Sequence, residues 1–352
     1  MKKTLLITAA IAAMACSCNP DKDCLPCKEG QLKTATLNVS LDLEDDTQTR
    51  ASSYVTAQPY EAAVNSVQVL VFDSSGALNA YVDADTRTSD ISISTTAGAK
   101  TVWAVVNGPD LSSVSTLAAL QSRTIDLSDN STTASAGFVM TGQTSCSVGS
   151  TVASANVAVR RMVARVALVK VNNALPSSYG AMTVNNVTLI NVVGNQNLAG
   201  TASISTWYNK MGRKDGATAS SQILDGSTNP ASCPTLTFKS VGSSVASGSS
   251  LSPTTPYLFY TYPNSTTTDV TGWSSTFTAR KTKLVVVVTI AGSRYYYPVV
   301  IDTPARNTAY TVELTITGLG ATDPDKPVEK GSINASVSVQ AWTGGAVYDE
   351  II

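Results

Sequence analysis

The sequence predicts an all-β protein made of two consecutive β-sandwich domains with few short helices. Apolar and polar residues alternate over many short segments, which is typical of strands that bury one face. Gly, Ser, Asn and Asp separate these segments, as expected for turns. The chain has 352 residues, and one hydrophobic core stops growing before that length, which favours two domains.

The first half begins with a predicted strand at residues 36–43. A loop at 44–50 follows it, is acidic and polar, and ends at Arg50. A short helix is predicted at 111–120 from its apolar spacing. In the last strand segment of this half, Arg160, Arg161 and Arg165 interleave with valines and are expected at the surface. The apolar positions of the first strand are Leu37, Val39, Leu41 and Leu43; the other strand segments are 67–73, 78–83, 101–107, 138–144 and 155–171.

A loop at residues 172–180, which contains Pro176, is the predicted boundary between the domains. It divides the mature chain into an N-terminal sandwich at 51–175 and a C-terminal sandwich at 176–352. A closing strand is predicted at 332–342, where apolar residues again alternate with polar ones. Its apolar positions are Ile333, Ala335, Val337, Val339 and Ala341; the other strand segments of this half are 182–193, 257–262, 284–290, 295–301 and 310–318.

The composition excludes several classes of function. The chain contains no His, so a Ser-His-Asp triad, a His general base and a His-ligated zinc site are all ruled out. A net charge of −1 argues against nucleic acid as a partner, because phosphate binding needs a basic surface. We predict no enzyme activity, no metal site and no cofactor.

The first residues predict export. Two lysines precede an apolar run at residues 5–14, a basic and then apolar pattern that marks a secretory signal peptide at 1–18. Cysteines that follow small residues resemble a bacterial lipobox, whose cysteine carries lipid. Cys18 is the favoured lipidation site because a polar tether begins directly after it, and Cys16 is the alternative. Residues 19–50 form this tether and the first strand; Cys24 and Cys27 within it are interpreted as a passive disulfide or as spare thiols.

Several segments together resemble the fimbrillins of Bacteroidales, the major fimbrial subunit family also called type V pilins. The segments run in the family's order and cover almost the whole chain. The resemblance implies transthyretin-like sandwiches, a structural role without enzyme activity, and a place in a cell-surface fimbria. The segments are VQVLVFD at 67–73, RRMVARV at 160–166, YTYPN at 260–264, RNTAYTV at 306–312 and GLGATDPDKP at 318–327.

The resemblance also implies a maturation route. The precursor would be a lipoprotein anchored in the outer membrane, and a trypsin-like, Arg-specific protease would cut it between Arg50 and Ala51. The leader strand at 36–43 would leave, and a neighbour's closing strand, which has the same alternation, would replace it as a donor strand. The implied partners are copies of the chain, other fimbrial subunits, and a host or bacterial surface receptor.

Three alternatives remain open from the sequence. Both strands could simply pair within their own domains. The chain could be a tip or anchor subunit of a fimbria instead of a shaft subunit. It could also be a monomeric surface lipoprotein that binds glycans, with Trp207, Tyr208 and residues 295–297 as a sugar platform, although aromatic residues in strands usually pack across a sheet.

Overall fold

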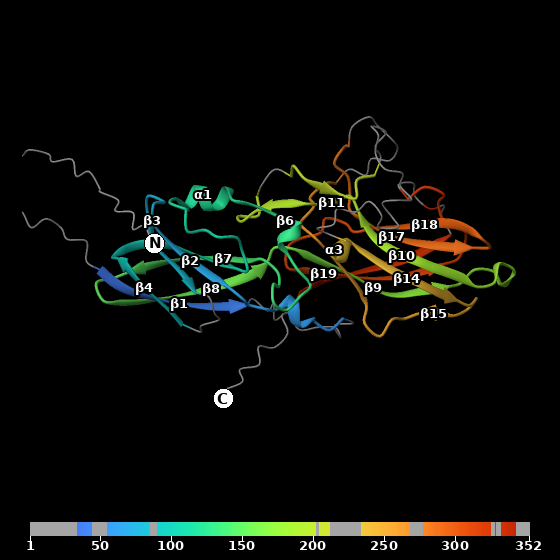
Figure 1. The fold of residues 1–352 in the computed structure, drawn as a ribbon, viewed down its shortest axis with the longest axis horizontal. Coiled ribbons are helices and arrows are strands. Elements are labelled where there is room, and N and C mark those ends of the chain that lie inside the picture. Colours follow the sequence, from blue (N-terminus) through green and yellow to red (C-terminus); the bar gives the residue numbers. More distant parts are fainter. Residues whose placement is uncertain are drawn as a thin grey trace, which may run out of the picture.

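Strands dominate the architecture, in two groups of sheets that lie end to end along the long axis (Figure 1). The computed structural model describes residues 34–43, 55–84, 90–201, 204–211, 234–267, 277–324, 328 and 332–342. Among these residues the helices are short: α1 (Leu117–Ser122), α3 (Pro234–Thr237) and three 3-10 turns at Pro59–Glu61, Leu127–Asp129 and Ser177–Tyr179. The all-β prediction is therefore confirmed.

The N-terminal group is one seven-stranded sheet in the order β3-β2-β5-β7-β8-β1-β4. The hairpin strands β7 and β8 pair only through Met140–Arg161 and Thr141–Arg160. Beyond these two pairs they diverge, and the sheet curls around an apolar cluster to which β1, β2, β4, β5, β7 and β8 all contribute. The strands are β1 (Thr34–Leu43), β2 (Val67–Asp73), β3 (Leu78–Ala84), β4 (Asp90–Thr96), β5 (Gly98–Val106), β7 (Met140–Val148) and β8 (Val152–Arg161).

The C-terminal group consists of two main sheets with a core between them. One has the order β14-β10-β17-β18, and the other has the order β15-β9-β19-β20 with β16 also paired to β9. Strand β17 is buried along almost its whole length, which explains its continuous apolar run. The strands are β9 (Ala164–Asn173), β10 (Met182–Ile190), β14 (Phe238–Val245), β15 (Ser250–Leu251), β16 (Tyr257–Thr261), β17 (Lys283–Ile290), β18 (Ser293–Val300), β19 (Thr308–Ile316) and β20 (Ile333–Ala341).

Two small ladders add to these sheets. Strand β11 (Val192–Val193) pairs with β13 (Trp207–Tyr208). Strand β12 (Asn195–Asn197) pairs with β6 (Thr124–Asp126), so that a segment of the second half binds the first half. A single apolar cluster runs through both groups, from Phe72 and Trp103 in the first to Val286 and Leu314 in the second. The two groups are therefore packed together through a shared core.

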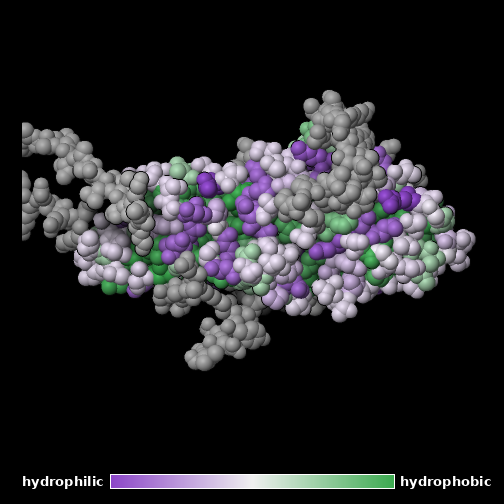
Figure 2. Space-filling model, in the orientation of Figure 1, coloured by the Kyte–Doolittle hydropathy of each residue, from purple (hydrophilic) through white to green (hydrophobic). Residues whose placement is uncertain are grey.

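Several expected elements differ from those observed. The helix expected at 111–120 begins only at Leu117, because Thr116 caps it by accepting a hydrogen bond from the Ala119 amide. The segment expected as one strand at 155–171 is two strands, which are separated at Met162 and Val163 and belong to different groups. The division of the chain at 175/176 stays a prediction. On the face in view in Figure 2, pale colours of intermediate hydropathy predominate, in keeping with abundant Ser and Thr.

Candidate functional site

Strand β1 lies inside the N-terminal sheet, between β8 and β4. It runs parallel to β8, from Thr36 opposite Val152 to Leu43 opposite Val159. It runs antiparallel to β4, from Thr34 opposite Thr96 to Ser40 opposite Asp90. Among the described strands, β4 has no other ladder partner. Strand β1 therefore connects β4 to the rest of the sheet.

The side chains of β1 alternate between the core and the opposite face. Leu37 and Val39 are fully buried, Ala35 is 7% exposed, and Leu41 packs against the same cluster while being partly buried. On the polar face, Ser92 Oγ donates a hydrogen bond to Asn38 Oδ1 at 2.8 Å. A sheet without β1 would have unpaired backbone groups on β8 and β4 and an apolar slot between them.

The closing strand β20 is far less buried. Among the described strands it pairs with β19 alone, at the edge of its sheet, from Thr308 opposite Ala341 to Ile316 opposite Ile333. Ile333 and Val337 are partly buried, Ala335 is exposed, and Val339 is 59% exposed. The strand thus carries an apolar stripe that its own subunit covers only in part.

The predicted processing sites lie outside the described residues. This holds for Cys16 and Cys18, for Cys24 and Cys27, and for the Arg50–Ala51 bond. Val55, the first described residue after the predicted cut, is buried in the core shared by the two groups. The chain is therefore anchored in the core from Val55 onward.

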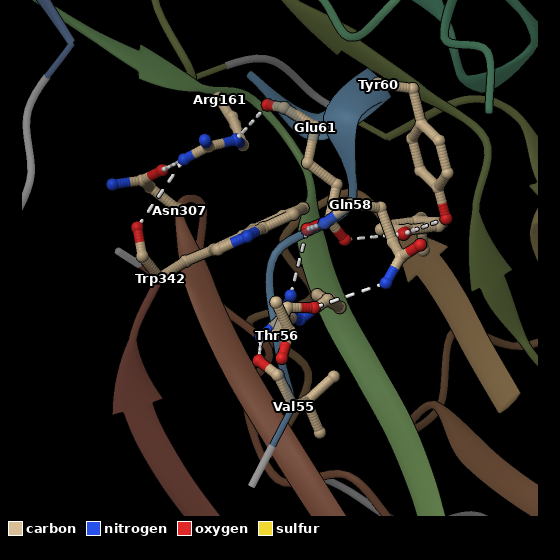
Figure 3. A network of polar contacts seen from close by, with 10 residues as sticks. Val55, Thr56, Gln58, Tyr60, Glu61, Arg161, Asn307 and Trp342 are labelled. Carbon is tan, nitrogen blue, oxygen red and sulfur yellow. Dashed lines mark hydrogen bonds and ion pairs between the residues drawn. The ribbon is translucent and has the colours of Figure 1, made fainter. Parts of the chain in front are cut away.

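A buried polar cluster lies where the two groups of sheets meet (Figure 3). Glu61, at the end of a short 3-10 turn, is fully buried and accepts a hydrogen bond from Arg165 Nη1 at 2.9 Å and from the Tyr260 hydroxyl at 2.7 Å. Arg161 Nε donates to the Glu61 carbonyl, and Arg161 Nη1 donates to Asn307 Oδ1 at 3.2 Å. The cluster therefore ties the segment after Val55 to β8, β9, β16 and the start of β19.

Trp342, directly after β20, completes this cluster. Its ring is fully buried and stacks on Tyr260, with 5.8 Å between centroids. The guanidinium carbons of Arg161 and Arg165 lie 4.7 Å and 5.2 Å from the ring centroid, within range of cation–π attraction. The expectation that these two arginines lie at the surface is wrong, because Glu61, Tyr260 and Trp342 cover them. Arg160 is exposed as expected.

The environment of this cluster keeps its tyrosines protonated. Burial, and next the charge of Glu61, raise the pKa of the Tyr260 hydroxyl far above its ordinary value. Burial also raises the pKa of Tyr60, whose hydroxyl lies 3.1 Å from that of Tyr260. A protonated Tyr260 is the hydrogen-bond donor that the buried Glu61 carboxylate requires.

The aromatic residues of the predicted sugar platform have packing roles. Tyr297 is fully buried and its hydroxyl donates to the Gly318 carbonyl at 2.8 Å, while Tyr296 is 6% exposed. Trp207 packs on Phe277, with ring centroids 5.3 Å apart. Within the described ranges, no group of three or more Cys, Asp or Glu side chains is placed to hold a metal ion. No helix among the described residues is long and apolar enough to cross a membrane.

The strands described above define a β-rich fold. A family model described as "Major fimbrial subunit protein (FimA)" matches residues 35–271. The chain belongs to this family. It is accordingly a fimbrial structural subunit and not an enzyme, it assembles with other fimbrial subunits, and its place is the cell-surface fimbria.

Solved structures share the fold across nearly the whole chain. A candidate cell adhesion protein from Parabacteroides distasonis has 18% identity and a TM-score of 0.64, over 90% of this chain and 99% of that one. One from Bacteroides eggerthii has 22% identity and a TM-score of 0.60, over 89% and 97%. A fimbrilin from Porphyromonas gingivalis has 13% identity and a TM-score of 0.58, over 88% and 98%. No curated protein matches the sequence.

Proposed function

We propose that the chain is a shaft subunit of the fimbria and that β1 is a removable leader strand. The observation that carries the proposal is the position of β1 between β8 and β4, where it fills an apolar slot with Leu37 and Val39. Removal of an internal strand creates an adhesive groove, and an extended strand from another chain can fill such a groove by strand addition.

The closing strand β20 is the proposed donor. Its apolar positions, Ile333, Ala335, Val337, Val339 and Ala341, have the same spacing as those of the leader strand. It is an edge strand with exposed apolar side chains, so its transfer to a neighbour buries apolar surface that the monomer leaves in water. Use of two different surfaces in each copy gives an open filament.

Processing connects these two strands. We propose export with the signal peptide 1–18, lipidation at Cys18 or alternatively at Cys16, and anchoring of the precursor in the outer membrane. A trypsin-like, Arg-specific protease then cuts after Arg50 and releases residues 19–50, including β1, so that the mature chain starts at Ala51. The mature chain would comprise transthyretin-like sandwiches at 51–175 and 176–352, and a host or bacterial receptor would bind the finished fimbria.

Electron microscopy of the purified precursor before and after limited trypsin digestion tests this proposal. We expect filaments only after the cut. Arg50→Ala should stay monomeric after digestion, whereas Arg294→Ala, which removes an exposed arginine on β18, should assemble normally. Filaments from uncut precursor, or normal assembly by Arg50→Ala, would contradict the leader-strand role.

A second experiment tests the donor. A chain that ends before Ser332 should be cut as usual but should form no filaments, because it keeps the groove and lacks the strand. Unaltered protein added to this truncated protein should still bind it. Filaments from the truncated chain alone would exclude β20 as the donor.

Two other functions remain as alternatives. A tip or anchor subunit would share the fold but would occupy one end of a fimbria. A monomeric glycan-binding lipoprotein would keep its lipid and its leader strand. The N-terminus of protein taken from cells distinguishes these cases: Ala51 supports a cut subunit, and an acylated cysteine supports the monomeric lipoprotein or an uncut anchor.

A further inference from the structure

The ring of Trp342 occupies a socket made by Phe138, Arg161, Arg165, Tyr260 and Asn307, which we call the Trp342 socket. Phe138 contacts the ring edge-on, with centroids 6.1 Å apart. The Trp342 amide donates to the Asn307 carbonyl at 3.0 Å, and the Asn307 amide donates to the Val163 carbonyl at 3.0 Å. The socket therefore lies at the connection between β8 and β9, directly beyond the end of β8.

We propose that in the fimbria each Trp342 socket is filled by Trp342 of the neighbouring subunit. This inference rests on the strand exchange proposed above and adds a second contact to it. The donated strand would be held by its apolar stripe in the groove and by a single aromatic anchor at its end.

The first argument concerns what departure of β20 leaves behind. Trp342 follows Ala341, the last residue of β20, so a strand that moves to a neighbour takes the indole with it. The emptied socket then contains a cavity and two buried arginines, Arg161 at 2% and Arg165 at 5% exposure, which have lost the face of an aromatic ring. A cavity is destabilising, and both arginines lose a cation–π contact with the indole while they keep their hydrogen bonds to Glu61. The emptied socket therefore favours a new aromatic occupant.

The second argument concerns where a donated strand ends. Strand β1 runs parallel to β8 and stops with Leu43 opposite Val159, two residues before Arg161. If positions 333, 335, 337, 339 and 341 take the places of 35, 37, 39, 41 and 43, Trp342 comes level with Arg160. Each strand residue advances about 3.3 Å, so the backbone of the incoming residue 342 comes within about one residue of Arg161.

The third argument is that the seat within one subunit is imperfect. The indole Nε1 of Trp342 is buried and has no hydrogen-bond acceptor among the described residues. An unsatisfied buried donor lowers the free-energy cost of withdrawing the indole from the socket during strand exchange. The preceding strand also leaves Val339 largely exposed. Strand β20 and Trp342 therefore pack onto their own subunit, but they leave one buried donor unsatisfied and one valine exposed.

Photo-crosslinking of the full-length chain tests the inference. Benzoylphenylalanine placed at position 342 should crosslink within one molecule in the precursor. In filaments made from mixed heavy-isotope and ordinary subunits, it should give a covalent ladder whose crosslinks join position 342 of one copy to Phe138 or Tyr260 of another. Crosslinks that stay within one copy, or that map away from the socket, would overturn the proposal.

Tryptophan fluorescence tests the same point without placing benzoylphenylalanine, a bulkier residue, at position 342. A chain with Trp103, Trp207 and Trp273 changed to Phe reports only on Trp342. We expect equally low acrylamide quenching in precursor and filament, and quenching in the filament that rises to that of a free indole would contradict the inference.

The rate at which filaments release subunits measures how strongly Trp342 holds the donated strand. Filaments of Trp342→Ala should release subunits at least tenfold faster in mild denaturant than unaltered filaments, Trp342→Phe should lie between them, and the control Trp207→Ala should match the unaltered rate. An unchanged rate for Trp342→Ala would refute the anchor and leave strand exchange standing. Absence of any filament from cut, unaltered protein would instead refute strand exchange itself.

Discussion

At the junction of the two groups of sheets, charged side chains are buried and paired with each other. Glu61 is the carboxylate that binds Arg165 by an ion pair of 2.9 Å, and both side chains are almost completely buried. Such a pair stabilises little compared with an apolar replacement, but loss of one partner leaves the other charge buried and uncompensated. Loss of the charge on the Glu61 carboxylate should therefore have a large effect on the free energy of unfolding.

Glu61→Gln tests this directly. The substitution keeps the size of the side chain and removes its charge, so we expect the free energy of unfolding of the precursor to fall by about 3–5 kcal/mol. Urea denaturation followed by circular dichroism measures the change. Asp302→Asn is the matched control, because Asp302 pairs with Lys281 at 2.9 Å while its side chain is 70% exposed. A control as destabilising as Glu61→Gln would show that burial is not the cause.

Tyr260 gives the cluster a pH dependence at alkaline pH. Burial raises its pKa in the folded state above the ordinary value of 10.0, so the folded protein keeps a proton that the unfolded chain releases. Its contribution is complete below pH 10.0 and is lost as the pH rises beyond it, by about 1.4 kcal/mol per pH unit. Tyr260→Phe should show a shallower loss of stability in urea titrations above that pH. Identical slopes for the two proteins would contradict this prediction.

At the scale of elements, β1 and β20 share a sequence pattern but not an environment. Alternation was sufficient to predict both strands, because each repeats apolar residues with a period of two. It could not predict that β1 lies between β8 and β4, since strand order depends on contacts between distant segments. Strand β4 was missed although Ile91 and Ile93 alternate with serine, and that signal could have found it.

The buried arginines illustrate the same limit. Arg161 and Arg165 interleave with valines, a pattern typical of a strand with one exposed face. Arg165 pairs with Glu61 at a sequence separation of 104 residues, and Arg161 donates to the Trp342 carbonyl at a separation of 181 residues, so no local pattern indicates that they meet. The candidate strands were thus predictable from local spacing, whereas the cluster that joins their ends was not.

Leu37→Ala should lower the stability of the precursor but not that of the fimbria. Leu37 is fully buried in β1, so its truncation should lower the stability of the precursor by about 2–5 kcal/mol. After the cut the residue is gone, and filaments from the variant should have unaltered stability. Asn38→Ala, on the polar face of the same strand, is the control. Thermal melts of precursor and filament supply the comparison, and weakened filaments from Leu37→Ala would count against removal of β1.

Val339→Asp in β20 should block filament formation but leave the precursor almost as stable as before. Val339 is 59% exposed, so the change should alter the stability of the precursor by no more than about 0.5 kcal/mol. A carboxylate at this position should block filament formation, because strand exchange would bury it without a partner. Ser338→Asp, on the opposite face of the strand, should still assemble. Turbidity after trypsin digestion records both outcomes, and normal assembly by Val339→Asp would argue against burial of this position.

At the scale of the whole molecule, the N-terminal group has an apolar cluster of its own in addition to the core that both groups share. The cluster that includes Leu37 and Val39 is confined to the N-terminal group, whereas the larger cluster runs through both groups. Loss of β1 removes residues from the first cluster only. The cut subunit should therefore loosen locally around β4 and β8 while the rest of the fold persists.

Hydrogen exchange measured by mass spectrometry tests this local loosening. Immediately after the cut, amides of Asp90–Thr96 in β4 should exchange much faster, because β1 is the ladder partner of β4. Amides of Lys283–Ile290 in β17 lie between two strands and should be unaffected. Protection of β4 should return in the filament. Equal acceleration in β17 would indicate global unfolding instead.

The direction of β1 has a mechanical consequence. The strand runs along the long axis of the molecule and its ladder with β8 extends from Thr36 to Leu43 (Figure 1). In a fibre joined through this slot, tension along the fibre pulls the donated strand lengthwise past its neighbours. All rungs of the ladder then share the load and must break together, whereas a strand pulled sideways would peel off one rung at a time. The orientation of the slot therefore suits a thread that must resist pulling.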